Sequence, residues 1–312
     1  MRAATISGGK IAVAEHPDPE AGRGEVLVRV RAAGLNGADL HQLAGNYPAP
    51  PGSPPDIPGL ELAGEVAALG PGAARFAVGD RVMGITGGGG QAELAVVHER
   101  QLMAVPENLS WEEAGGVPEV FITAHDAVFT RCALGPGERL LVHGGAGGVG
   151  TAAIQIAAAA GARVYATVRD EGAWKAVGAL GASVISPQGF SEHGPFDVIL
   201  ELVGAPNLAE DAQALAFGGR IAVIGIGAGA RGELDLRPLM YKCITIHGAA
   251  LRARPLEEKA LKTRALERHV LPLLASGVVR VPLAAAFPLE HVDRAYERFA
   301  AGRKVGKIVL LP

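Results

Sequence analysis

The feature that most constrains this chain is a glycine-rich loop between an apolar run and an alanine-rich run. The loop HGGAGGVG covers residues 143–150 and follows RLLV. Its spacing, G-x-G-x-x-G, is typical of a dinucleotide-binding turn when a strand precedes it and a helix follows. The free N–H groups at the start of such a helix favour phosphate. We therefore expect the loop to bind a dinucleotide through Gly145, Ala146, Gly147, Gly148, Val149 and Gly150. The alternative is a glycine-rich turn without a ligand.

Two patterns divide the chain. Residues 1 to about 110 contain short Val- and Ala-rich runs separated by Gly, Pro and Asp, which favours a barrel-like β fold. The proline-rich segment 43–58 is expected to be a surface loop. From about residue 119, apolar strands alternate with helical runs, which predicts a parallel sheet covered on both faces. The segment after residue 255 predicts an amphipathic helix perturbed at Pro272. The ending KVGKIVLLP predicts a last strand, and the sequence permits this last segment to complete the first domain.

The end of the second strand of the α/β region bears on the choice of cofactor. NAD-binding proteins place an acidic residue about 20 residues beyond the glycine loop, at a position that is Val168 here. Arg169 follows it, and a guanidinium there is suited to a 2′-phosphate, which favours NADPH. Lys175 is a second candidate for the phosphate. Asp170 and Glu171 leave NADH open, and Arg169 as an ordinary surface charge is the other alternative.

Composition limits the other classes of function. The chain has 312 residues, 49% hydrophobic and 20% charged, so we expect two globular domains. The net charge of −3 comes from interspersed acidic and basic residues, which argues against nucleic acid and against an anionic membrane. Two cysteines indicate no disulfide framework. No apolar run of the roughly 18 residues needed for a spanning helix occurs, and the N-terminus lacks a signal-like apolar segment. We expect a cytoplasmic protein.

Several motifs together resemble one family over nearly the whole length. They are AAGLNGADLHQLAGNYP, IPGLELAGEV, GDRVMGI, PEVFITAHDAVF, HGGAGGVG and LRARPLEEK. The chain is similar to the zinc-free quinone oxidoreductase branch, which includes zeta-crystallin, of the medium-chain dehydrogenase/reductase superfamily, and most similar to its stress-inducible subgroup. The resemblance implies an α/β fold with a GroES-like β-barrel-type catalytic domain at 1–118 and 256–312. A Rossmann domain with a doubly wound parallel sheet would occupy 119–255.

The resemblance also implies that no zinc takes part. Zinc-containing relatives have a Cys where this chain has Asn36, a His where it has Leu60, and a third ligand near Glu119. Asparagine and leucine cannot replace thiolate and imidazole around Zn²⁺. The cysteine lobe for a structural zinc is absent, and the nine histidines show no ligand spacing. We therefore expect no metal site.

Without a metal, the chemistry rests on hydride transfer and on a few polar side chains. The resemblance places Asn36, Tyr47 and Thr123 at the nicotinamide end of the cofactor. Each has an ordinary alternative: a turn residue, a loop cap and a hydrogen bond within a helix. Strand ends near the nicotinamide, and a late position that contacts cofactor in relatives, add Leu202, Gly204, Gly225 and Lys304 as candidates. The two glycines are alternatively turn residues, and relatives usually have Asn at the Lys304 position.

Three functions stay open from the sequence. The first is an NADPH-dependent quinone oxidoreductase that reduces quinones or small conjugated carbonyls. The second is an enoyl-thioester reductase in which Tyr47 donates the proton, although the proline-rich loop has no Lys or Arg for the phosphates of a CoA thioester. The third is an NADPH-binding protein with little turnover. The resemblance further implies a homodimer in which ITIHGAA, residues 244–250, pairs across a two-fold axis.

Overall fold

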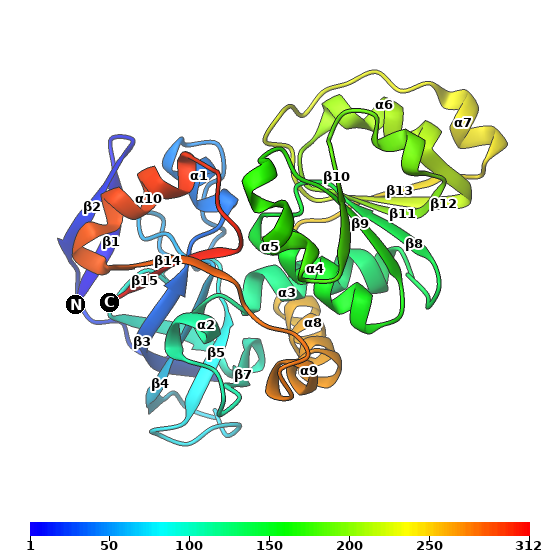
Figure 1. Cartoon of the computed structure of the whole chain (residues 1–312). Coiled ribbons are helices and arrows are strands. Elements are labelled where there is room, and N and C mark those ends of the chain that lie inside the picture. The colour runs from blue at the N-terminus through cyan, green and yellow to red at the C-terminus, as the bar shows by residue number, and fades with distance from the viewer. The chain divides into compact units, whose positions relative to one another are not determined.

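The computed structural model describes all 312 residues, which form two compact units (Figure 1). The first unit contains Met1–Ile122, Leu251–Gly302 and Lys307–Pro312. The second contains Thr123–Ala250 and Arg303–Gly306. The division expected from the family resemblance, 1–118 with 256–312 against 119–255, stays a prediction. No helix of the structure combines the length and the apolar composition needed to cross a membrane.

Six parallel strands form the sheet of the second unit. Their spatial order is β10-β9-β8-β11-β12-β13, so the order reverses between β8 and β11. This is the strand order of a doubly wound dinucleotide-binding fold, in which ligands bind outside the carboxyl ends of the strands where the order reverses. The predicted Rossmann sheet is confirmed. The strands are β8 (Arg139–Val142), β9 (Arg163–Thr167), β10 (Ala182–Ile185), β11 (Phe196–Glu201), β12 (Leu215–Val223) and β13 (Thr245–Gly248).

The core of this sheet follows from its apolar strands. Leu141, Phe196, Ile199 and Ile221 are fully buried and belong to one cluster. Near-continuous apolar runs of this kind are typical of parallel strands that are covered on both faces. The crossover helices are α4 (Gly148–Ala159), α5 (Trp174–Gly178), α6 (Ala205–Ala214) and α7 (Leu236–Tyr241). The turn between β8 and α4 is the glycine-rich loop.

The first unit contains a mainly antiparallel sheet with the order β14-β15-β3-β4-β5-β7, and β6 also pairs with β3. Its core consists of alternating apolar residues such as Val26, Val28 and Val30. The hairpin β1-β2 lies outside this sheet. The strands are β1 (Arg2–Ser7), β2 (Lys10–Glu15), β3 (Glu25–Gly34), β4 (Glu61–Leu69), β5 (Arg81–Ile85), β6 (Leu94–His98), β7 (Leu102–Ala104), β14 (Leu283–Pro288) and β15 (Lys307–Leu311). The predicted GroES-like barrel-type fold is confirmed.

Strand β15 lies near the end of the chain and pairs antiparallel with the last residues of β3, a strand near the beginning of the chain. Val309 lies opposite Gly34 and Leu310 opposite Ala33. This register brings Lys307, the first residue of β15, to the point where β3 ends and Asn36 begins the next turn. A contact between residues 36 and 307 cannot be read from local sequence, because it depends on this long-range pairing.

The helices of the first unit are short apart from α8. The helical segment predicted after residue 255 divides into two helices at Val270, which ends α8 and precedes α9. Pro272 explains the break, because proline has no N–H to donate to the preceding turn. The helices are α1 (Gly37–Leu43), α2 (Trp111–Gly115), α3 (Pro118–His125), which continues into the second unit, α8 (Leu256–His269), α9 (Leu271–Ala275) and α10 (Val292–Ala300).

The close packing of β3 against β4 yields a stability prediction. A Cβ at Gly64 would lie 2.1 Å from the Arg29 carbonyl oxygen, so Gly64→Ala forces the two strands apart. We expect a loss of about 1–3 kcal/mol in the free energy of unfolding, measured by urea denaturation. Gly37→Ala is the matched control, since a Cβ there meets no atom within 4 Å and alanine favours the helix. Equal midpoints for Gly64→Ala and the wild type would contradict the packing.

Candidate functional site

The three glycines of the G-x-G-x-x-G spacing are present for different structural reasons. A Cβ at Gly145 would lie 2.7 Å from the Ala166 side chain, and one at Gly150 would lie 2.6 Å from the Gly144 carbonyl oxygen. Packing within the chain therefore requires both. At Gly147, the nearest atom would be 3.5 Å away, an ordinary contact. The space beside Gly147 is open, which fits the close approach of a pyrophosphate.

The start of α4 fits an anionic ligand. Gly147 is the N-cap, no side chain caps the helix, and its first turn holds no acidic residue. The first hydrogen bond of the helix runs from the Thr151 N–H to the Gly147 carbonyl oxygen at 2.8 Å. The N–H groups of Gly148, Val149 and Gly150 precede it and have no partner of this type. These donors, together with the helix dipole, suit the phosphates of a dinucleotide.

Arg169 follows the carboxyl end of β9 and is exposed. Its guanidinium forms no hydrogen bond or ion pair with the protein, so it is available to a ligand. The Asp170 carboxylate instead accepts a hydrogen bond from the Gly172 N–H at 3.1 Å. Val168, at the position of the NAD-type acid, is buried, and its carbonyl accepts from the Trp174 indole. Lys175 is also exposed.

The remaining cofactor candidates lie in two places of the second unit. A Cβ at Gly225 would lie 2.2 Å from the Leu202 carbonyl oxygen, and Gly204 adopts φ +130°. Packing and backbone geometry alone explain both glycines, so a cofactor role for Leu202, Gly204 and Gly225 stays a prediction. The segment of Lys304 lies against the glycine loop, because the Gly306 N–H donates to the Ala146 carbonyl oxygen at 2.9 Å.

Sequence reasoning missed a buried polar cluster at the carboxyl ends of β8 and β11 in the parallel sheet. Ligand-type atoms of His143, Glu201 and Asp211 lie within 4.8 Å of one another. The His143 ring contacts Asp211 Oδ1 through Nε2 at 2.8 Å and Thr167 Oγ1 through Nδ1 at 3.1 Å. Burial raises the pKa of Asp211 to about 6, with His143 opposing the rise and Glu201 adding to it.

This cluster holds the turn that follows β11. Glu201 accepts hydrogen bonds from the Gly204 N–H at 2.7 Å and the Asn207 amide at 2.9 Å, and also from the Val203 N–H. Both its oxygens are therefore committed to the chain. The one available signal was position, since His143 directly follows β8 and Glu201 ends β11. No spacing pattern connects residues so far apart.

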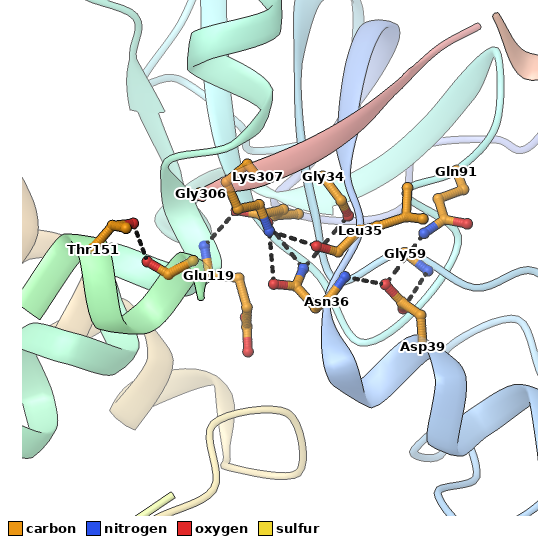
Figure 2. A network of polar contacts seen from close by, with 12 residues as sticks. Gly34, Leu35, Asn36, Asp39, Gly59, Gln91, Glu119, Thr151, Gly306 and Lys307 are labelled. Carbon is orange, nitrogen blue, oxygen red and sulfur yellow. Dashed lines mark hydrogen bonds and ion pairs between the residues drawn. The ribbon is translucent and has the colours of Figure 1, made fainter. Parts of the chain in front are cut away.

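The first unit contains a second buried network, centred on Lys307 (Figure 2). Its ammonium donates to Glu61 Oε1 at 2.6 Å, to Asn36 Oδ1 at 2.8 Å and to the Leu35 carbonyl oxygen at 2.7 Å. Lys307 and Glu61 are 2% and 0% exposed. The other Glu61 oxygen accepts from the Glu119 N–H at 2.8 Å. One ion pair thus connects β15, β4, the end of β3 and the start of α3.

Asn36 is a fully bonded member of this network. Its Nδ2 donates to Glu61 at 2.9 Å and its Oδ1 accepts from Lys307. Its backbone N–H donates to the Asp39 carboxylate at 2.8 Å. Asp39 also accepts from Gly59 N–H and the Gln91 amide, both at 3.3 Å, and burial raises its pKa to about 6. Both ends of the Asn36 amide are occupied, so a direct role in chemistry stays a prediction.

Tyr47 lies in the proline-rich loop and is half-buried. Its hydroxyl forms no hydrogen bond with the protein, and burial together with nearby Glu119 raises its pKa. Arg252 holds this loop: its guanidinium stacks 5.1 Å from the Tyr47 ring and donates to the carbonyl oxygens of Tyr47 and Gly87 and to the Gln42 side chain. Arg252 was missed as an individual residue, although it belongs to the LRARPLEEK motif. Thr123 lies four residues after Glu119 on α3, and its hydroxyl makes no hydrogen bond in its helix.

The positions compared with zinc ligands are occupied by different chemistry. The Leu60 side chain is 1% exposed and part of the core, and the Asn36 amide is committed as described. Neither offers a ligand of the kind that Zn²⁺ requires. The expectation that no zinc takes part stays a prediction.

Comparisons with known proteins assign this architecture. The profile of the alcohol dehydrogenase GroES-like domain matches residues 22–107, and that of the zinc-binding dehydrogenase family matches 148–266. Human quinone oxidoreductase is 32% identical over 302 residues, covering 92% of this chain and 89% of that protein. Acryloyl-coenzyme A reductase of Metallosphaera sedula is 33% identical over 343 residues, covering 99% of both.

Two further similarities are informative. The polyketide synthase GfsB of Streptomyces halstedii is 34% identical over 294 residues, but this chain spans only 5% of its length. A mycobacterial protein solved in complex with NADPH superposes with a TM-score of 0.87 at 27% identity, with full coverage of both chains. The chain belongs to the medium-chain dehydrogenase/reductase superfamily. It is an oxidoreductase of this type and has the fold of the nicotinamide-dependent members. Quinone oxidoreductases are among its relatives.

The buried ion pair gives a prediction about stability. Lys307→Met leaves the Glu61 carboxylate buried without its cation, and we expect a loss of about 3–5 kcal/mol in the free energy of unfolding. The double variant Lys307→Met/Glu61→Gln removes the unpaired charge, and we expect it to be more stable than the single variant. Urea denaturation of the three proteins measures the difference. A double variant less stable than Lys307→Met would contradict this account of the network.

Proposed function

We propose that the protein transfers a hydride from NADPH to quinones or similar small conjugated carbonyls, without zinc. The observation that carries the proposal is the free, exposed guanidinium of Arg169 just after β9, in the same unit as a glycine loop with open space at Gly147. A 2′-phosphate would form charge-assisted hydrogen bonds with this guanidinium, whereas a carboxylate at that place would repel it.

The residues of the second unit would hold the cofactor at its phosphates. The N–H groups of Gly148, Val149 and Gly150 would bind the pyrophosphate, and Arg169 would bind the 2′-phosphate. When bound, the nicotinamide supplies the hydride. Leu202, Gly204, Gly225 and Lys304 are proposed to line the rest of the cofactor site. Their backbone, rather than their side-chain chemistry, would make most of these contacts.

The first unit would supply the polar groups for the substrate. The Tyr47 hydroxyl makes no hydrogen bond within the protein, and a raised pKa keeps it protonated at neutral pH. The Lys307 network would hold Asn36 in one orientation. The guanidinium of Arg252 is committed to the chain, and the loop 43–58 has no Lys or Arg, so this region has little charge for the phosphates of a CoA thioester. This favours a small, uncharged acceptor such as a quinone.

An enoyl-thioester reductase is the second candidate. Two observations favour it: the free Tyr47 hydroxyl, and the similarity to acryloyl-coenzyme A reductase over 99% of both chains. Reduction of an enoyl thioester requires a proton at the α-carbon after the hydride reaches the β-carbon. In this function Tyr47 would donate that proton.

The cofactor proposal predicts the effect of Arg169→Ala. Loss of a charged hydrogen bond costs about 1.5–3 kcal/mol, so we expect kcat/KM with NADPH to fall roughly 10- to 100-fold. The value with NADH should change little, because NADH has no 2′-phosphate. Oxidation of each cofactor with a simple quinone measures both. Arg163→Ala, at the amino end of the same strand, is the matched control and should change neither value.

Outcomes of the same assay separate the alternatives. Turnover of crotonyl-CoA alone, abolished by Tyr47→Phe, would replace the quinone proposal by enoyl reduction. Tight NADPH binding without turnover of either acceptor would indicate a binding protein. A wild type that prefers NADH would refute the role of Arg169.

We propose further that two copies associate through the second unit. Strand β13 forms an edge of the parallel sheet, so one side of its backbone is unpaired. Large apolar side chains are exposed in the preceding segment of the same unit: Phe217, Ile226, Leu236, Met240 and Tyr241. A homodimer that continues the sheet through residues 244–250 would cover such a surface.

We also propose a cytoplasmic location. Both cysteines are free thiols, which agrees with a reducing compartment.

Sedimentation tests the homodimer. We expect the wild type to sediment as a dimer and Tyr241→Glu, which places a charge in the apolar surface, to shift toward monomer at micromolar concentration. Leu261→Glu is the matched control, because Leu261 is 66% exposed on α8 of the first unit. A monomeric wild type would refute the proposal.

A further inference from the structure

Glu119 has a fixed backbone and a free acid group. Its N–H donates to Glu61 Oε2 at 2.8 Å, at the start of α3. Its carboxyl group forms no hydrogen bond or ion pair with the protein, and the residue as a whole is largely but not fully buried. Figure 2 shows this carboxyl group pointing away from Lys307 and Asn36. The network therefore positions the residue without using its acid group.

The neighbouring polar groups of the first unit are already committed. Lys307 donates to three oxygen atoms, and the Asn36 amide is bonded at both ends. Asp39 accepts from three N–H donors. Three interacting groups here have no hydrogen-bond partner within the chain: the Glu119 carboxyl, the Tyr47 hydroxyl and the buried Lys259 ammonium.

Burial, together with neighbouring carboxylates, raises the pKa of the Glu119 carboxyl and keeps it neutral. Burial, and then the Glu61 carboxylate, raise its pKa to about 8, and Asp39 adds to the rise. The ammonium groups of Lys307 and Lys259 oppose it. At neutral pH the group therefore carries a proton and is a hydrogen-bond donor. The titratable groups that interact with it are Glu61 on β4, Lys307 on β15, Asp39 on α1, Lys259 on α8, Tyr47 in the proline-rich loop and Arg252 before α8.

We propose that the protonated Glu119 carboxyl donates a hydrogen bond to the carbonyl oxygen of the substrate and is the general acid of the reaction. The inference rests on the proposed function, since it assumes a carbonyl acceptor and a hydride donor. When the hydride adds to the acceptor, the electron pair of the carbonyl π bond moves onto the oxygen, which becomes negatively charged. The Glu119 O–H bond breaks and a substrate O–H bond forms, which leaves Glu119 as a carboxylate. A proton from solvent restores the acid.

Glu119 suits this step better than Tyr47. An acid is most effective when its pKa lies near the working pH. The pKa of Tyr47 is raised above its ordinary value of 10.0, whereas that of Glu119 lies near 8. Glu119 is therefore the stronger acid of the two and still protonated at pH 7. Tyr47 would act mainly as a second hydrogen-bond donor.

The pH dependence of quinone reduction by NADPH tests the inference. The active form is the protonated one, so kcat/KM of the wild type should be constant below pH 8 and fall about tenfold per pH unit above it. Glu119→Gln keeps the shape but has no proton to transfer. We expect its kcat/KM at pH 7 to be lower by roughly 10²-fold and to show no fall near pH 8. Glu112→Gln, in the first turn of α2, is the matched control and should behave like the wild type.

A second measurement reports the proton without activity. Because the folded-state pKa lies above the ordinary value of 4.5, the stability that this proton contributes is present at low pH and is lost as the pH rises toward 8. The melting temperature of the wild type should therefore fall over this range relative to that of Glu119→Gln. The inference would be overturned if the melting temperatures of the two proteins changed in the same way with pH. It would also be overturned if Glu119→Gln reproduced the pH dependence of kcat/KM of the wild type. A wild type that reduces neither quinone nor crotonyl-CoA would refute the proposed function itself.

Discussion

The buried ion pair between Lys307 and Glu61 is the interaction on which the arrangement of the first unit depends. Two fully desolvated charges are tolerated in a protein core only when each is satisfied by further hydrogen bonds. Here the ammonium has three acceptors, and the carboxylate accepts from Lys307, Asn36 and the Glu119 backbone. The pair therefore joins four segments that are far apart in the sequence. Its cost in desolvation is offset only if all four are in place.

The polar residues around this ion pair take part in the network in two different ways. Asn36 and Asp39 use their side chains to complete the network, whereas Glu119 contributes its backbone and keeps its carboxyl group free. The negative charge of Glu61, close to that carboxyl, contributes to its raised pKa. After burial, which is the larger cause, an interaction that stabilises the fold thus also influences the protonation state of a neighbouring acid. In the second unit, Glu201 has a comparable structural role, since it holds the turn after β11 through backbone donors.

Much of the molecule could be predicted from local sequence. The G-x-G-x-x-G spacing, with a strand before it and a helix after it, predicted the turn between β8 and α4. The alternation of apolar and helical runs predicted the parallel sheet. These signals are local because strands and helices are selected by the period of their apolar residues. Reading Arg169 as a phosphate ligand also needed only its distance from the loop, and the structure adds that Asp170 is engaged with its own turn.

The sequence by itself therefore determined the class of fold, the position of the glycine-rich loop and the candidate Arg169, and through the family resemblance the candidate Tyr47. Only the tertiary structure decided which polar groups are committed and which are free. It joined Lys307 to Asn36 and Glu61, Arg252 to the proline-rich loop, and His143 to Asp211. These contacts connect residues separated by 68 to 271 positions. The reason is physical: the period of a strand or helix is written in neighbouring residues, whereas the partner of a buried charge depends on which distant strands pair and in what register.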